Sequence, residues 1–130
     1  MKRLDSEFWQ ISLPDDWISD EDDGCTSIYH DKGVGMLEVS AVEQPDEIVP
    51  DDLLSLASEH LDQGAKVETV ELGDFDGIEL NYVEDDIYWR EWYLKSGKLL
   101  LFVTYNCDTG DEEKEEGMLD VMLATLKTAP

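Results

Sequence analysis

The chain has 130 residues, 42% of them hydrophobic and 12 of them Trp, Tyr or Phe, so its length and composition suit a single globular domain spanning residues 1–130. Asp and Glu number 33 against nine Lys and Arg, which gives a formal net charge of −24 at pH 7. A field of that sign repels nucleic acid and anionic membranes, so we expect neither as a partner, and it attracts basic protein surfaces. Solubility alone, or adaptation to a salty cytoplasm, would also account for the acidity, and both interpretations stay open.

The first elements alternate strand and turn. Residues 7–13 alternate apolar and polar side chains up to Pro14, which predicts a half-buried strand. The stretch from Pro14 to Trp17 is typical of a turn that returns an aromatic side chain to the core. Two further strands are expected at 26–31 and 36–43, with a turn between them.

A helix is predicted after the first strands. Pro50 suits the first helical position, and Asp51 and Asp52 lie where the helix dipole favours anions. Apolar residues then recur at helical spacing until Gly64, which predicts the end of the helix.

Four strands are predicted next, at 66–72, 77–84, 87–95 and 98–106, and the Ser96-Gly97 pair indicates a tight hairpin. A second helix is expected from about Thr109, where Thr109 and Glu112 have the spacing of a capping box, with a buried stripe ending at Leu126. The element order is therefore βββ-α-ββββ-α, an α+β domain with a meandering antiparallel sheet.

Several residues in this order resemble one superfamily. They are Phe8, Ile11, Leu13, Pro14 and Trp17, then Gly35-x-Leu37-x-Val39-Ser40, and then Tyr88-Trp89-Arg90-x-Trp92-Tyr93-Leu94. Together they resemble the PsbP/Mog-type fold, whose members include a photosystem lumenal subunit, a Ran-binding protein and many bacterial proteins. The resemblance covers nearly the whole chain. It implies a three-layer α/β/α sandwich, which the predicted order would fill with about seven strands and two helices. It implies no reaction, because the known members mostly bind proteins.

No catalytic or metal-binding pattern is evident. His30 and His60 are the only histidines, and there is no nucleophile elbow, phosphate loop or dinucleotide fingerprint. The acidic runs at 20–24 and 74–77 lack the glycine that a calcium loop needs at its sixth position, and the cysteines and histidines lack zinc-finger spacing. We therefore expect no enzyme activity, no cofactor and no metal.

The strand around Arg90 is the strongest candidate site. Alternation places Tyr88, Arg90 and Trp92 on one face, and these residue types dominate the energies of protein interfaces. The other interpretation is an internal ion pair or a cation–π contact of Arg90 with Trp92. The acidic cluster Glu112, Glu113 and Glu116 is either a solvated helix start or part of an anionic face for a basic partner.

The cysteines and the N-terminus bear on location. Cys25 and Cys107 are far apart in sequence, and we expect separate reduced thiols, with pairing across a sheet left open. No apolar signal core follows Met1 and no segment is long enough to span a bilayer, so we expect a cytoplasmic protein.

The leading hypothesis is a non-enzymatic domain that binds a basic protein, as an acidic chaperone or an immunity-like inhibitor. The alternatives are a small ligand-binding or enzymatic domain, with a pocket between sheet and helix that uses His30, His60 or Arg90, and a housekeeping protein whose acidity is salt adaptation.

Overall fold

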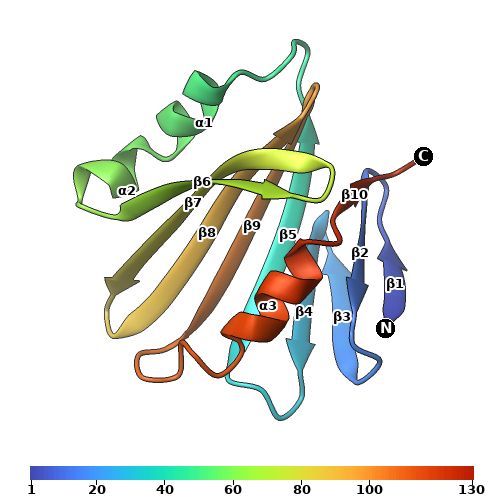
Figure 1. Ribbon diagram of the computed structural model, residues 1–130, viewed down its shortest axis with the longest axis vertical. Helices are drawn as coiled ribbons and strands as arrows, with labels where there is room; N and C mark the ends of the chain where they lie inside the picture. The colour runs from blue at the N-terminus through green and yellow to red at the C-terminus, as the bar shows by residue number, and fades with distance from the viewer.

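The computed structural model describes residues 1–130 and has ten strands and three helices in three layers (Figure 1). The middle layer is a seven-stranded antiparallel sheet in the order β3-β4-β5-β9-β8-β7-β6. Its strands are β3 (Trp17–Asp22), β4 (Cys25–His30), β5 (Gly35–Glu43), β6 (Lys66–Leu72), β7 (Phe75–Glu84), β8 (Ile87–Ser96) and β9 (Leu99–Asp108). All neighbours in this sheet are antiparallel, and most of them are joined by tight turns.

A small second sheet joins the two ends of the chain. Strand β2 (Trp9–Leu13) pairs with β1 (Lys2–Asp5) on one side and with β10 (Lys127–Thr128) on the other. Figure 1 shows this sheet beside α3 (Glu116–Leu123), on the same side of the molecule. The opposite layer consists of α1 (Pro50–Leu56) and α2 (Ser58–Asp62).

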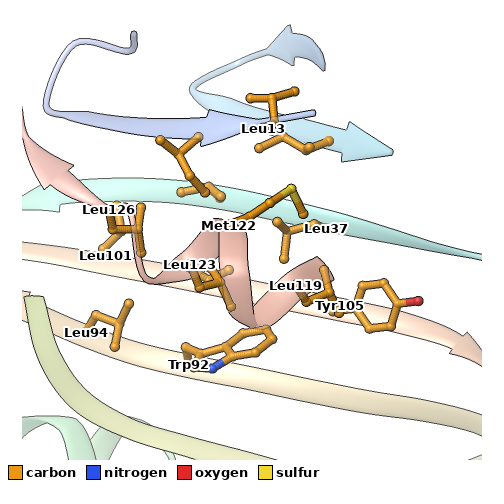
Figure 2. Packing of buried hydrophobic residues seen from close by; sticks show 14 of the residues in the cluster. Leu13, Leu37, Trp92, Leu94, Leu101, Tyr105, Leu119, Met122, Leu123 and Leu126 are labelled. Atoms are coloured by element: carbon orange, nitrogen blue, oxygen red, sulfur yellow. The ribbon is translucent and has the colours of Figure 1, made fainter. Parts of the chain in front are cut away.

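Two hydrophobic cores separate these layers. The larger lies between the sheet, α3 and β2, and Figure 2 shows Leu119, Met122 and Leu123 of α3 pointing toward Trp92, Leu101 and Leu37 of the sheet. The smaller lies beneath α1 on the other face and contains Ile48, Leu53, Ala57, Ile78, Leu80 and Tyr93. Successive side chains of β8 point alternately into the two cores, as strand geometry predicts: Trp92 and Leu94 lie in the larger core and Tyr93 in the smaller.

Local turn chemistry sets the meander. Gly97 has φ of 60° in the β8–β9 hairpin, as expected for the Ser96-Gly97 signal. Asp85 and Asp86 also have positive φ, 54° and 64°, in the β7–β8 turn, where Asp tolerates this region better than most residues.

The predicted fold class and the seven-stranded sheet are confirmed, with differences in detail. Residues 17–22, at the end of the predicted turn and beyond it, form strand β3, and the strand predicted at 7–13 joins the small sheet as β2. The first predicted helix is divided at Ala57 into α1 and α2.

The last helix begins at Glu116 rather than at Thr109. Gly110 has φ of 99°, a conformation that an α-helix cannot contain, so no helix runs through it. Its N–H donates a hydrogen bond to Glu112 Oε2 at 2.6 Å. The predicted capping box is therefore wrong, because Glu112 closes a local turn instead of capping Thr109.

The cysteines lie on opposite faces of the sheet. Cys107 is buried in the larger core, whereas Cys25 is opposite Ser40 on the other face, and both are free thiols. None of the three helices combines the length and apolar character needed to cross a bilayer.

Candidate functional site

Tyr88, Arg90 and Trp92 project from β8 toward α3, as alternation predicts. Arg90 is 7% exposed and Trp92 is fully buried, while Tyr88 is partly exposed. Figure 2 shows the Trp92 ring beneath Leu119 and Leu123 of α3. Of the three side chains, only Tyr88 offers surface that a partner could reach.

The contacts of Arg90 are intramolecular. Its Nη2 donates to Glu79 Oε1 at 3.0 Å and to Asp120 Oδ1 at 3.1 Å, and Trp92 Nε1 donates to the same Glu79 oxygen at 2.8 Å. The guanidinium carbon lies 4.7 Å from the Trp92 ring centroid. Burial acts to lower the pKa of Arg90, but the hydrogen bonds and charges of Glu79 and Asp120 outweigh it, so the pKa is raised.

The acidic residues at the start of α3 differ in burial and in their contacts. Glu113 and Glu116 are exposed, and Glu112 is half-buried at the turn described above. Glu115, which no sequence pattern singles out, is 9% exposed, and its Oε1 accepts hydrogen bonds from Tyr105 Oη at 2.7 Å and Gly35 N at 3.1 Å. This carboxylate therefore fixes the start of α3 to β9 and β5.

A second buried carboxylate lies under α2. Glu91 accepts hydrogen bonds from Tyr82 Oη at 2.9 Å and Tyr93 Oη at 3.2 Å, and His60 Nε2 lies 3.5 Å from its Oε1. The His60 ring stacks on Tyr82 with centroids 4.5 Å apart. Burial, followed by the interactions with Glu91, raises the pKa of both tyrosines.

His30 joins two turns. Its Nδ1 accepts a hydrogen bond from Lys32 N at 3.1 Å, and its Nε2 lies 3.0 Å from Asp16 Oδ2, so both ring nitrogens are engaged. Neither histidine is hydrogen-bonded to a serine, threonine or cysteine side chain. No group of three or more His, Cys, Asp and Glu side chains lies close enough to hold a metal ion.

Two surface hollows bear on the small-molecule alternative. One, of about 420 Å³, is lined by the 44–48 loop, α1 and Leu100. Its lining includes none of His30, His60 and Arg90, the residues that a pocket of that kind was expected to use. Another of about 420 Å³ lies beside His30 and Trp17, with Lys32, Lys114 and Glu115 at its wall.

The sheet leaves part of one face uncovered. The core under α1 reaches from β7 only as far as Leu100 and Phe102 of β9, and Figure 1 shows α1 and α2 at the β6–β8 end of the sheet. The side chains of β3, β4 and β5 on this face therefore have no helix packed on them. We call this surface the open face; its residues are Ile18, Asp20, Asp22, Cys25, Ser27, Tyr29, Met36, Glu38, Ser40 and Val42.

The open face mixes apolar side chains with carboxylates. Tyr29, Met36 and Val42 supply apolar surface, and Val42 is 52% exposed. The acids are held in place, since Asp20 Oδ2 accepts from Tyr29 Oη at 2.8 Å and Glu38 Oε2 lies 3.5 Å from Cys25 Sγ. Neither Asp20, Asp22 nor Glu38 has a cationic partner. Alternation could have shown which side chains share a face, but not which half of that face the helices cover.

No family model and no curated protein matches the chain. A crystal structure from Bacteroides thetaiotaomicron VPI-5482 is similar over 94% of this chain, with a TM-score of 0.67 and 19% identity. This chain spans 45% of that protein. LpqN of Mycobacterium tuberculosis, a protein involved in cell envelope biogenesis, has a similar crystal structure. The similarity covers 94% of this chain and 83% of LpqN, with a TM-score of 0.64 and 16% identity.

A solution structure of cyanobacterial PsbP (CyanoP) from Synechocystis sp. PCC 6803 also aligns, over 98% of this chain and 92% of its own, with a TM-score of 0.47 and 13% identity. What the first two structures share with this chain is the fold alone.

Proposed function

We propose that this chain is a non-enzymatic domain that binds a basic protein through the open face, as an acidic chaperone or an immunity-like inhibitor would. The observation that carries the proposal is the open face itself: an unpacked strip of sheet on which Tyr29 and Met36 lie among carboxylates without cationic partners. A surface of this kind complements a basic, partly apolar partner surface.

The overall charge supports the same partner. Six of the 33 carboxylates lie within ion-pair distance of a Lys, Arg or N-terminal nitrogen and three more lie beside a histidine, so most of the negative charge is free to act outward. Such a field speeds the encounter with a basic protein and disfavours acidic competitors. Apolar contacts at the open face would then slow dissociation.

The location of this surface differs from the strand that the sequence favoured. Arg90 and Trp92 are used inside the molecule, which matches the internal ion pair and cation–π contact that we kept as the other interpretation. Tyr88, Glu113 and Glu116 are within reach of a partner and stay predicted contacts near α3.

The test compares two variants that keep the net charge at −24. Y29A/M36A removes apolar surface from the open face, and M118A/V121A removes exposed apolar surface from α3 as a control. Each tagged protein captures partners from a lysate of the source organism, washed at about 0.15 M salt to screen non-specific attraction. A basic protein recovered with the wild type is then purified, and its affinity for all three proteins is measured by calorimetry.

We expect the open-face variant to bind at least about tenfold more weakly, because hot-spot side chains of this kind carry most of an interface energy, and the control to bind like the wild type. Recovery of nothing, or of a diffuse set that the salt removes, would overturn the proposal and favour solubility or salt adaptation. Equal binding by all three proteins would overturn the assignment to the open face.

A further inference from the structure

Strand β6 forms the edge of the large sheet at the end opposite the open face (Figure 1). Its only sheet neighbour is β7, and its outward backbone N–H and C=O groups have no hydrogen-bond partner in the molecule. Five of its seven residues are exposed; Val70 and Leu72, partly buried, pack on the larger core. The strand therefore presents a template to which an extended segment can add.

A hollow beside this edge supplies a place for a side chain. It has a volume of about 290 Å³, lies between α1 and the β6–β7 pair, and is lined by Leu53, Leu54, Val67, Thr69 and Ile78 among others. Leu54 and Val67 are 41% and 45% exposed, so apolar surface faces solvent at this hollow. In strand addition the backbone supplies affinity, and such hollows select the side chains that alternate along the added segment.

Charge decides what kind of segment fits. Glu68 and Glu71 project from opposite faces of β6, and neither has an ion pair. A second copy of this chain would bring acidic edges together within a pair of molecules that each carry −24, which disfavours β6-to-β6 pairing. Lysine or arginine beside Glu68 and Glu71 would instead form favourable cross-strand pairs.

We propose that the β6 edge and the hollow beside α1 bind an extended basic segment of another protein, which adds as an eighth strand and places an apolar side chain in the hollow. The site does not depend on the open face, since it lies at the other end of the sheet. It adds a main-chain recognition mode that the proposed function does not include.

The probe is a short synthetic peptide in which lysine and valine alternate, labelled with a fluorophore and titrated with the full chain at about 0.15 M salt. A second peptide carries N-methyl groups at alternate backbone positions. It keeps every charge and side chain but loses the N–H donors that an added strand needs. Only one alternate set of N–H groups in an added strand faces β6, so one peptide is methylated on each set. We expect the peptide methylated on the set that faces β6 to bind at least about tenfold more weakly.

Two variants with equal charge changes locate the site on the protein. E68K/E71K changes β6, and E7K/E43K makes the same charge change at two exposed residues that belong neither to β6 nor to the open face. We expect the first variant to weaken binding of the unmethylated peptide at least about tenfold, because it turns the attraction between peptide lysines and Glu68 and Glu71 into repulsion. The second variant should weaken binding less than about threefold, because its residues lie away from the bound peptide. Hydrogen exchange of the wild-type complex should show new protection at amides within 66–72.

Full binding of both methylated peptides, or protection of amides at β3 rather than β6, would overturn the proposal, and neither measurement needs a variant to fold. Concentration-dependent dimerisation that E68K/E71K abolishes would overturn the choice of occupant in favour of a second copy. Failure at β6 leaves capture through the open face unaffected, and Y29A/M36A should bind the peptide as the wild type does, so the two proposals are tested separately.

Discussion

Arg90 and Asp120 are joined by an ion pair of 3.1 Å between Nη2 and Oδ1, which ties the central strand β8 to α3. The same Nη2 lies 3.0 Å from Glu79 Oε1. The two carboxylates differ in their surroundings, since the Glu79 side chain is 13% exposed and that of Asp120 is 58% exposed. Solvent screens the second pair, so most of the structural effect of Arg90 should come from Glu79.

Substitution of Arg90 by Met should therefore lower the free energy of unfolding by about 3–5 kcal/mol, because Glu79 is left as a buried charge without a cation. Substitution of Asp120 by Asn should cost less than about 1 kcal/mol, because the lost pair is largely solvated. Urea unfolding followed by tryptophan fluorescence measures both. Equal losses in the two variants would contradict this ranking.

Glu115 allows a sharper comparison of two substitutions at one position. Glu115→Ala leaves the Tyr105 hydroxyl and the Gly35 N–H without their acceptor, which should lower the free energy of unfolding by about 1–3 kcal/mol. Glu115→Gln keeps a carbonyl acceptor and should lower it by less. Thermal unfolding of both variants tests this order, and a Gln variant less stable than the Ala variant would show that the negative charge itself matters.

The sequence predicted elements well where local signals act alone. The bounds of β6 were predicted to the residue, and those of β8 to within one residue, because alternation and turn residues such as Ser96-Gly97 are short-range signals. The two faces of β8 also follow from alternation, which places Arg90 and Trp92 on one face, where the guanidinium lies over the ring.

Apart from the start of α3, where Gly110 and Glu112 form a local turn, the failures involve partners distant in sequence. Asp20, Glu21 and Asp22 are poor strand formers, and they belong to β3 because β4 pairs with them. Strands β1 and β10 need β2, and Lys127 pairs with Gln10 across almost the whole chain. The open face depends on where α1 and α2 come to rest on the sheet, and no local pattern encodes that position.

The two thiols should differ in reactivity. Burial raises the pKa of both, and the hydrogen bond and charge of Glu38 add to the increase at Cys25. Cys107 is 3% exposed, so we expect no labelling there before unfolding, whereas Cys25 should react, more slowly than an unstructured thiol.

The variants C25S and C107S each leave one thiol for a maleimide assay read by mass spectrometry. Rapid labelling of native C25S, which retains only Cys107, would contradict this expectation.

Alkaline pH should destabilise the fold through its tyrosines. Burial first, and then the hydrogen bond and charge of Glu115, raise the pKa of Tyr105 above its ordinary value of 10.0. The folded chain therefore holds this proton after the unfolded chain has lost it. The stability linked to Tyr105 is fully present below about pH 10 and is lost as the pH rises from there toward the folded pKa, at about 1.4 kcal/mol per pH unit.

Tyr105→Phe separates this contribution from the alkaline titration of the other groups. The variant should be less stable than the wild type at neutral pH, because Glu115 loses the 2.7 Å hydrogen bond from the hydroxyl. Above about pH 10 its free energy of unfolding should fall less steeply with pH, by the slope that one tyrosine contributes, so the two curves converge. Urea unfolding at a series of pH values gives both curves. Parallel curves would mean that Tyr105 ionises equally in the folded and unfolded chains, which its burial against a carboxylate opposes.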